Sequence, residues 1–195
     1  MMSQLRPALV SMALFTFILG LAYPLGVTGL AQLLMPAQAD GSLLRDREGR
    51  VIGSARVGQA FEQERYLHPR PSAAGEGYDA SASSGSNLGP LNPAFAQQVR
   101  DRAARLRAES PAPIPGDALT ASASGLDPDI SPANAERQVA RIAAARGLPE
   151  SVVRDAIAEA TTRPLFGFIG QPAVNVLKTN LALDAATAGA QPRAR

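Results

Sequence analysis

Residues 7–39 read PALVSMALFTFILGLAYPLGVTGLAQLLMPAQA, an apolar run without a charged side chain that lies between Arg6 and Asp40. A helix needs about 20 apolar residues to cross the hydrocarbon core of a bilayer, because each backbone N–H and C=O must be satisfied there without water. No other stretch of the sequence is long and apolar enough to do so. The run therefore predicts a single transmembrane anchor within residues 1–36.

A cleaved export signal is the alternative interpretation of this run. Ala37-Gln38-Ala39 has the A-x-A form of a signal-peptidase site. The apolar core of a secretory signal is only about 7–15 residues long, whereas the apolar stretch here extends from Ala8 to Met35. Its length favours a retained anchor.

Small residues and a proline interrupt the apolar run at Gly20, Pro24, Gly26 and Gly29. Within a membrane, small residues allow a neighbouring helix to approach closely, and a packed neighbour makes a kink at proline tolerable. We therefore predict that these four residues dock against a partner helix. A lone anchor that merely tolerates them is the alternative.

The charges that flank the run give a weak orientation signal. Arg6 lies on one side, while Arg45, Arg47 and Arg50 lie on the other side among acidic residues. The positive-inside rule is thus nearly balanced, but large domains that follow a first span often translocate whatever their charge. We expect the amino terminus in the cytoplasm and the domain after the span outside it.

Composition excludes several classes of function. The formal net charge is +2, from 19 basic and 17 acidic residues that are interspersed along the chain. This pattern provides no basic patch for nucleic acid. Cysteine is absent, which excludes disulfides and thiolate metal sites.

The single lysine and the single histidine also argue against an independent enzyme. Lys178 is the only lysine and follows no glycine loop, so the chain has no Walker-type phosphate loop. His68 is the only histidine, which rules out a multi-histidine metal site. It lies next to Pro69 and near Pro71, which favour an extended or turn conformation. A structural or solvated histidine is therefore favoured over a catalytic one, and we expect neither a metal nor a catalytic residue.

Beyond the anchor, the sequence predicts one α+β domain at residues 37–184 and a flexible tail at 185–195. Apolar and turn residues predict strands at 42–44 and 51–55, and a last strand or bent strand pair at 173–183. Residues 69–92 are rich in Pro, Gly, Ser and Asn, a composition that in isolation is typical of a linker, although the position of this segment before a capped helix argues otherwise. Apolar residues at helical spacing predict three helices, at 93–108, at 132–146 and from 149 to before 164.

Two of these helices begin after loops of small residues. Asn92 and Ser131 stand at their N-cap positions, each followed by proline. The N–H groups and the positive dipole end of a helix N-terminus form a ready anion site. An exported or anchored anion-binding protein is thus an alternative function, although capping by Ser and Asn can satisfy the same donors.

Several short motifs occur together with the single N-terminal anchor. They are, in order, LRPAL at 5–9, RPSA at 70–73, GSNLGP at 85–90, TASASGLDP at 120–128, ISP at 130–132 and VNVL at 174–177. With these motifs the chain resembles the C subunit of the Kdp-type potassium-transporting ATPase, over all but the last ten or so residues.

The resemblance implies a role within a complex rather than a reaction. The family belongs to a bacterial inner-membrane complex that imports potassium with ATP hydrolysis. Its partners there are a channel-like, potassium-translocating subunit and a P-type ATP-hydrolysing subunit, together with membrane lipid. The C subunit is described as an assembly component and catalytic chaperone that raises the ATP affinity of the hydrolysing subunit. A non-catalytic subunit fits a sequence without a phosphorylation motif or phosphate loop.

The resemblance also implies a nucleotide contact at Gln138, with ATP shared with the hydrolysing subunit and no covalently bound cofactor. Ser124, Gly125 and Ser131 lie before or at the start of the same predicted helix, and we add them as candidate phosphate contacts. A capped helix with a surface glutamine is an equally good interpretation. An extracytoplasmic domain also conflicts with direct ATP contact, and we give the membrane topology more weight.

Overall fold

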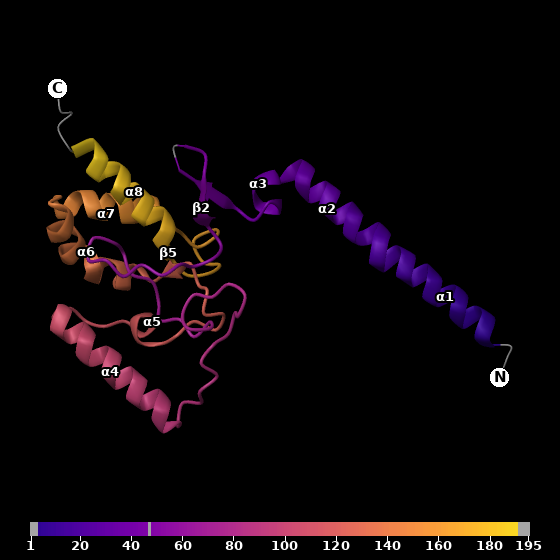
Figure 1. Ribbon diagram of the computed structural model, residues 1–195, viewed down its shortest axis with the longest axis horizontal. Helices are drawn as coiled ribbons and strands as arrows, with labels where there is room; N and C mark the ends of the chain where they lie inside the picture. Colours follow the sequence, from indigo (N-terminus) through magenta and orange to yellow (C-terminus); the bar gives the residue numbers. More distant parts are fainter. Residues whose placement is uncertain (1–3, 47, 191–195) are drawn as a thin grey trace. The chain divides into compact units, whose positions relative to one another are not determined.

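The computed structural model describes residues 4–46 and 48–190 of the chain (Figure 1). They divide between Ile52 and Gly53 into two compact units. The first unit contains the apolar run. The second contains the candidate site residues of the domain.

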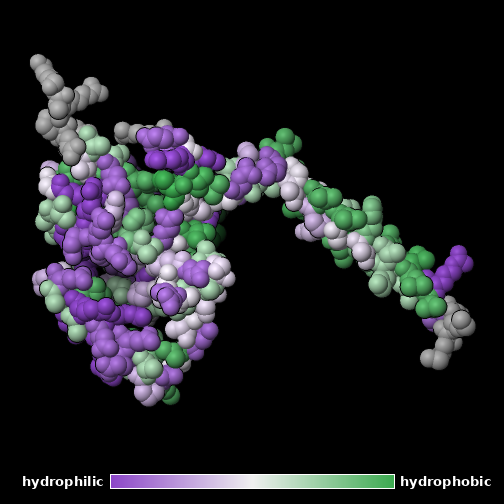
Figure 2. Space-filling model, viewed as in Figure 1, coloured by the Kyte–Doolittle hydropathy of each residue, from purple (hydrophilic) through white to green (hydrophobic). Residues whose placement is uncertain are grey.

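Leu5–Leu34 forms one continuous helix made of α1 (Leu5–Phe17), η2 (Ile18–Ala22) and α2 (Tyr23–Leu34). Its mean hydropathy reaches 2.0, and none of that stretch is buried within the protein. Apolar residues cover the helix along its length in Figure 2. By length and composition it can cross a membrane, which would cover the apolar side chains that the protein itself leaves exposed.

The helix contains a π-helical turn just before its proline. Tyr23 N–H donates to Ile18 O, which is the i→i−5 bond of a π-helix. In a regular α-helix the ring of Pro24 would clash with the carbonyl of Gly20, and a π turn relieves such a clash. A Cβ added at Gly26 or Gly29 would meet nothing within 4 Å. The four predicted docking positions thus lie on an uncovered helix, and their contact with a partner stays a prediction.

A short helix and a hairpin follow the apolar helix. They are α3 (Pro36–Ala39), β1 (Leu43–Arg45) and β2 (Val51–Ser54), with β1 and β2 paired in a two-stranded sheet. Asp46 organises the turn, because one carboxylate oxygen accepts from Glu48 N at 3.1 Å and from Arg50 N at 2.8 Å. The two predicted strands are confirmed. Arg47, in the predicted turn, lies outside the described residues.

The second unit combines helices with a small antiparallel sheet, which confirms the α+β fold. The sheet has the order β3 (Asp129–Ile130), β5 (Ala173–Asn175), β4 (Thr161–Thr162), and Val174 in the central strand pairs with Ile130 and Thr161. The helices are α4 (Pro93–Glu109), α5 (Gly116–Leu119), α6 (Pro132–Arg146), α7 (Glu150–Glu159) and α8 (Val176–Ala190).

The core lies where α6, α7 and α8 pack together and against β5 (Figure 1). Val139 and Ile142 of α6, Val153 of α7, Val174 of β5 and Leu183 of α8 are all almost fully buried. The helix α6 therefore turns an apolar face towards the core. Gly147 closes this helix as its C-cap, with φ +63°.

The predicted last strand is wrong after Asn175. That residue ends β5, and its side-chain oxygen accepts from Lys178 N at 3.1 Å, which caps the first turn of α8. The β-branched and apolar residues that follow resemble a strand, but the cap turns them into a helix as far as Ala190. Residues 185–190 of the predicted tail are thus helical, while 191–195 lie outside the described residues.

The linker-like segment 69–92 is folded against the loop at 120–128. Ser72 Oγ donates to Gly125 O at 2.6 Å, and Ser83 Oγ donates to Ser124 O at 2.9 Å. Gly125 has φ +68°, and a Cβ there would lie 2.6 Å from both Ala74 N and Ser84 O. The small residues of both loops are therefore needed for close backbone packing.

This contact predicts unequal effects of alanine at two glycines with left-handed backbone. Gly147→Ala meets no atom within 4 Å and should lower the free energy of unfolding by about 1 kcal/mol, through φ alone. Gly125→Ala adds a clash with two backbone segments and should lower it by about 2–4 kcal/mol. Urea unfolding of the full chain in detergent, followed by circular dichroism, measures both. Equal losses would show that the two loops do not pack closely.

Candidate functional site

An extended segment around His68 is held by two buried side-chain amides. Asn180 of α8 accepts from Leu67 N at 2.7 Å and donates to Leu67 O at 3.0 Å. Gln138 of α6 accepts from His68 N at 2.8 Å and donates to His68 O at 3.1 Å. We call these four hydrogen bonds the amide clamp. Each amide satisfies the N–H and the C=O of one residue, as a neighbouring β-strand would do.

Gln138 has no hydrogen-bonding capacity left over. Besides the two bonds to His68, its oxygen accepts from Arg141 Nη2 at 2.7 Å and its nitrogen donates to Asn134 Oδ1 at 3.3 Å. A primary amide has two acceptor positions and two donors, and the side chain is buried. A nucleotide contact at Gln138 stays a prediction, and it would require one of these bonds to open.

Ser131 caps α6 and also holds a carboxylate. Its Oγ accepts from Asn134 N at 3.1 Å and donates to Asp117 at 2.8 Å, and its N–H donates to the other Asp117 oxygen at 2.8 Å. Asn134 Nδ2 donates to the same carboxylate at 3.2 Å. The protein therefore supplies its own anion at the N-terminus of α6, where the helix dipole favours negative charge.

The N-terminus of α4 is also capped from within the chain. Asn92 Oδ1 accepts from Ala94 N at 2.9 Å. With Asp117 bound at α6, neither of the two helix starts supports the alternative of an anion-binding protein.

The four predicted nucleotide residues fall into two groups. Ser131 and Gln138 are linked through Asn134 on α6. Ser124 and Gly125 instead contact the loop at 72–84, and Ser124 Oγ accepts from Leu126 N at 3.1 Å. The contacts therefore join each pair but do not link the pairs to one another.

Arginines of α6 have a structural role that the sequence analysis missed. Arg137 is buried and donates to the carbonyls of Leu106 and Ser110 at the C-terminal end of α4. Its charge complements the negative end of that helix dipole and satisfies carbonyls without a helical partner. Arg146 is fully buried against Tyr66 and pairs with Asp184 at 2.9 Å. Arginine side chains are mostly exposed in proteins, so these positions resemble a solvated face in the sequence.

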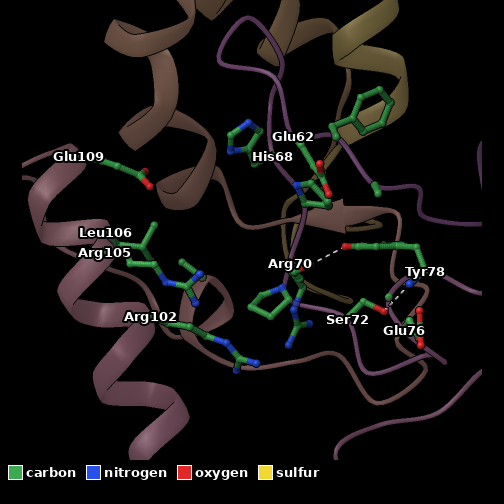
Figure 3. A pocket seen from close by; sticks show the side chains of 16 residues that line it. Glu62, His68, Arg70, Ser72, Glu76, Tyr78, Arg102, Arg105, Leu106 and Glu109 are labelled. Atoms are coloured by element: carbon green, nitrogen blue, oxygen red, sulfur yellow. Dashed lines mark hydrogen bonds between the residues drawn. The ribbon is translucent and has the colours of Figure 1, made fainter.

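A cavity of about 530 Å³ lies between α4 and the segment at 60–78. Arg102 and Arg105 extend from α4 towards it, while Arg70 and Tyr78 lie on the opposite wall (Figure 3). Burial, followed by the charge of Arg105, lowers the pKa of Arg102. Three glutamates also line the cavity, namely Glu62, Glu76 and Glu109. Its charge is therefore balanced and favours neither an anion nor a cation.

The only histidine of the chain lies at this cavity, with a perturbed pKa. Burial, followed by the nearby Arg141 charge, lowers the pKa of His68 below its ordinary value of 6.5. The contact of Nε2 with Gln63 O, at 3.0 Å, opposes this shift but is outweighed by burial and by Arg141. A structural role for His68 stays a prediction.

Replacing the clamp glutamine tests how much the clamp contributes. Gln138→Leu keeps the size but leaves the N–H and C=O of His68 without partners, which should lower the free energy of unfolding by about 2–5 kcal/mol. The matched change Gln97→Leu, on the exposed face of α4, should alter it by less than about 0.5 kcal/mol. Denaturant unfolding without nucleotide measures both. If the variants are equally stable, the clamp is dispensable.

The pKa of His68 predicts how stability depends on pH. As pH falls below 6.5, the unfolded chain takes up a proton that the folded chain binds less readily, so stability falls until the lower folded pKa is passed. His68→Gln should flatten this decline, and no second histidine obscures it. Melting temperatures between pH about 7 and about 5.5, above the usual carboxylate range, measure it. Identical profiles for both chains would contradict the lowered pKa.

Comparison with known proteins covers nearly the whole chain. Residues 5–185 match the family described as K+-transporting ATPase, c chain. Three similar relatives are named potassium-transporting ATPase KdpC subunit. The protein of Caulobacter vibrioides is 62% identical, over 95% of this chain and 94% of its own. Those of Caulobacter sp. strain K31 and Beijerinckia indica are 60% and 57% identical, over 95% of each chain. The chain belongs to the family of C subunits of potassium-transporting ATPases.

Proposed function

We propose that the chain is an accessory, non-catalytic subunit of an ATP-driven potassium import complex. In this role it promotes assembly and raises the ATP affinity of the P-type hydrolysing subunit. The observation that carries the proposal is the family match over residues 5–185. It is supported by the internal engagement of the polar groups at the candidate site, above all those of Gln138.

We further propose that the apolar helix docks against the membrane-embedded partners. Those partners are the potassium-translocating, channel-like subunit and the hydrolysing subunit. The exposed apolar surface of Leu5–Leu34 supports this, since lipid or another helix must cover it. Gly20, Pro24, Gly26 and Gly29 would let a neighbouring helix approach closely.

The proposed location is the bacterial inner membrane, with the amino terminus in the cytoplasm and the domain in the periplasm. The size of the domain after a first span supports this orientation. A reporter that is active on one side of the membrane only, fused after residue 190, tests it.

A domain outside the cytoplasm can change the ATP affinity of the hydrolysing subunit only indirectly. The chain would bind more tightly to the conformation of the hydrolysing subunit that has high ATP affinity. A tenfold gain in ATP affinity then needs about 1.4 kcal/mol of difference in binding between the two conformations. Linkage makes the effect reciprocal, so ATP must tighten the binding of the chain by the same factor.

Reciprocity gives a quantitative test with a non-hydrolysable ATP analogue. Adding the chain to the purified partner subunits should lower the Kd of the analogue, and saturating analogue should lower the Kd of the chain by an equal factor. A chain that ends at Asp40 keeps the apolar helix, and it should assemble without the full change in nucleotide affinity.

Three outcomes would contradict the proposal. The role in the complex fails if no multi-span ATPase partner accompanies the chain through detergent extraction and affinity purification. The indirect mechanism fails if the chain changes nucleotide affinity without the reciprocal effect. Photocrosslinking of a nucleotide analogue to α6 (Pro132–Arg146) would favour direct contact at Gln138 instead.

A further inference from the structure

The loop between β4 and β5 exposes four large apolar side chains within five residues. Leu165, Phe166, Phe168 and Ile169 are 60%, 79%, 77% and 52% exposed, respectively. We call Leu165–Ile169 the apolar tip. Single exposed apolar residues are ordinary, but a contiguous exposed group marks a contact with another apolar phase.

The tip is an ordered turn rather than a loose loop. Leu165 N–H donates to Ile169 O at 2.9 Å, and Ile169 N–H donates to Leu165 O at 3.0 Å. Phe166 adopts φ +53°, in the left-handed region that bulky residues avoid. Hydrogen bonds within the turn thus hold the backbone in place, while the apolar side chains are exposed. Strain at a bulky residue is typical of a functional position.

The charge nearest to the tip along the sequence is positive. Arg163 lies two positions before Leu165, and residues 164–177 contain no charged side chain. A cation beside exposed aromatic and aliphatic side chains is the combination that binds the interface of an anionic bilayer, where the rings enter the headgroup region and the cation meets phosphate.

The segment before the second unit limits how far the tip can lie from a bilayer that holds the apolar helix. The apolar helix ends at Leu34, and the second unit begins at Gly53. Even fully extended, the segment between them spans no more than about 70 Å. Such tethering gives the membrane surface a high effective concentration, so weak insertion is enough for occupancy.

We propose that the apolar tip inserts into the interfacial region of the anionic bilayer that holds the chain's own apolar helix. The occupant is lipid rather than protein, because the tip is a narrow turn in which four of the five N–H groups donate within the turn or to Pro164, and the polar headgroup region can hydrate its remaining carbonyls. A fluid interface accepts such a tip without a preformed groove. The inference requires only that the chain is anchored, and it stands whether or not the chain raises ATP affinity.

Tryptophan fluorescence tests the insertion directly, because the chain contains no tryptophan. The full-length Phe168→Trp chain is reconstituted in vesicles of phosphatidylcholine and phosphatidylglycerol, with or without bromine on the acyl chains. Insertion should place the indole within reach of the bromines, which should lower its emission by about twofold and shield it from aqueous quenchers. Vesicles without phosphatidylglycerol should give less quenching.

Leu91→Trp is the matched control. Leu91 is 97% exposed but lies just before α4, away from the tip, so brominated lipid should leave its emission unchanged. The proposal is overturned if Phe168→Trp is no more quenched than Leu91→Trp while circular dichroism shows a native fold. Shielding that arises only when the other pump subunits are added would assign the tip to a protein partner, and would likewise overturn insertion into lipid.

Discussion

The amide clamp is the constraint on which the domain depends. The segment around His68 is flanked by Pro69 and Pro71, which lack an N–H, so a regular β-ladder cannot hold it. Gln138 and Asn180 supply the missing partners from two helices of the core. Because a buried backbone group without a partner is costly, these two amides fix where the chain enters the loops that follow.

The clamp also determines what the domain can offer to other molecules. The side-chain amide of Gln138 is engaged within the protein, and the start of α6 is closed by the carboxylate of Asp117. Charges around the cavity between α4 and the segment at 60–78 balance one another.

The sequence predicted the regular elements well because their signals are local. The helices α4 and α6 follow from proline at the first position and from apolar spacing, and the early hairpin follows from its turn.

The structure after Asn175 was assigned as a strand because the sequence does not show that this side chain caps a helix. The clamp joins residues about 70 and 113 positions apart, so no local pattern reveals it. The buried arginines could not be predicted, because arginine usually indicates a solvated face.

The π turn in the apolar helix changes the directions in which side chains before and after it face. One additional residue in a turn shifts the azimuth of everything after it by about 100°. Gly20 therefore belongs to the transition, whereas Gly26 and Gly29 lie in the rotated half beyond it. The side chains on either side of the π turn therefore face directions, relative to one another, that an unbroken α-helix would not give them.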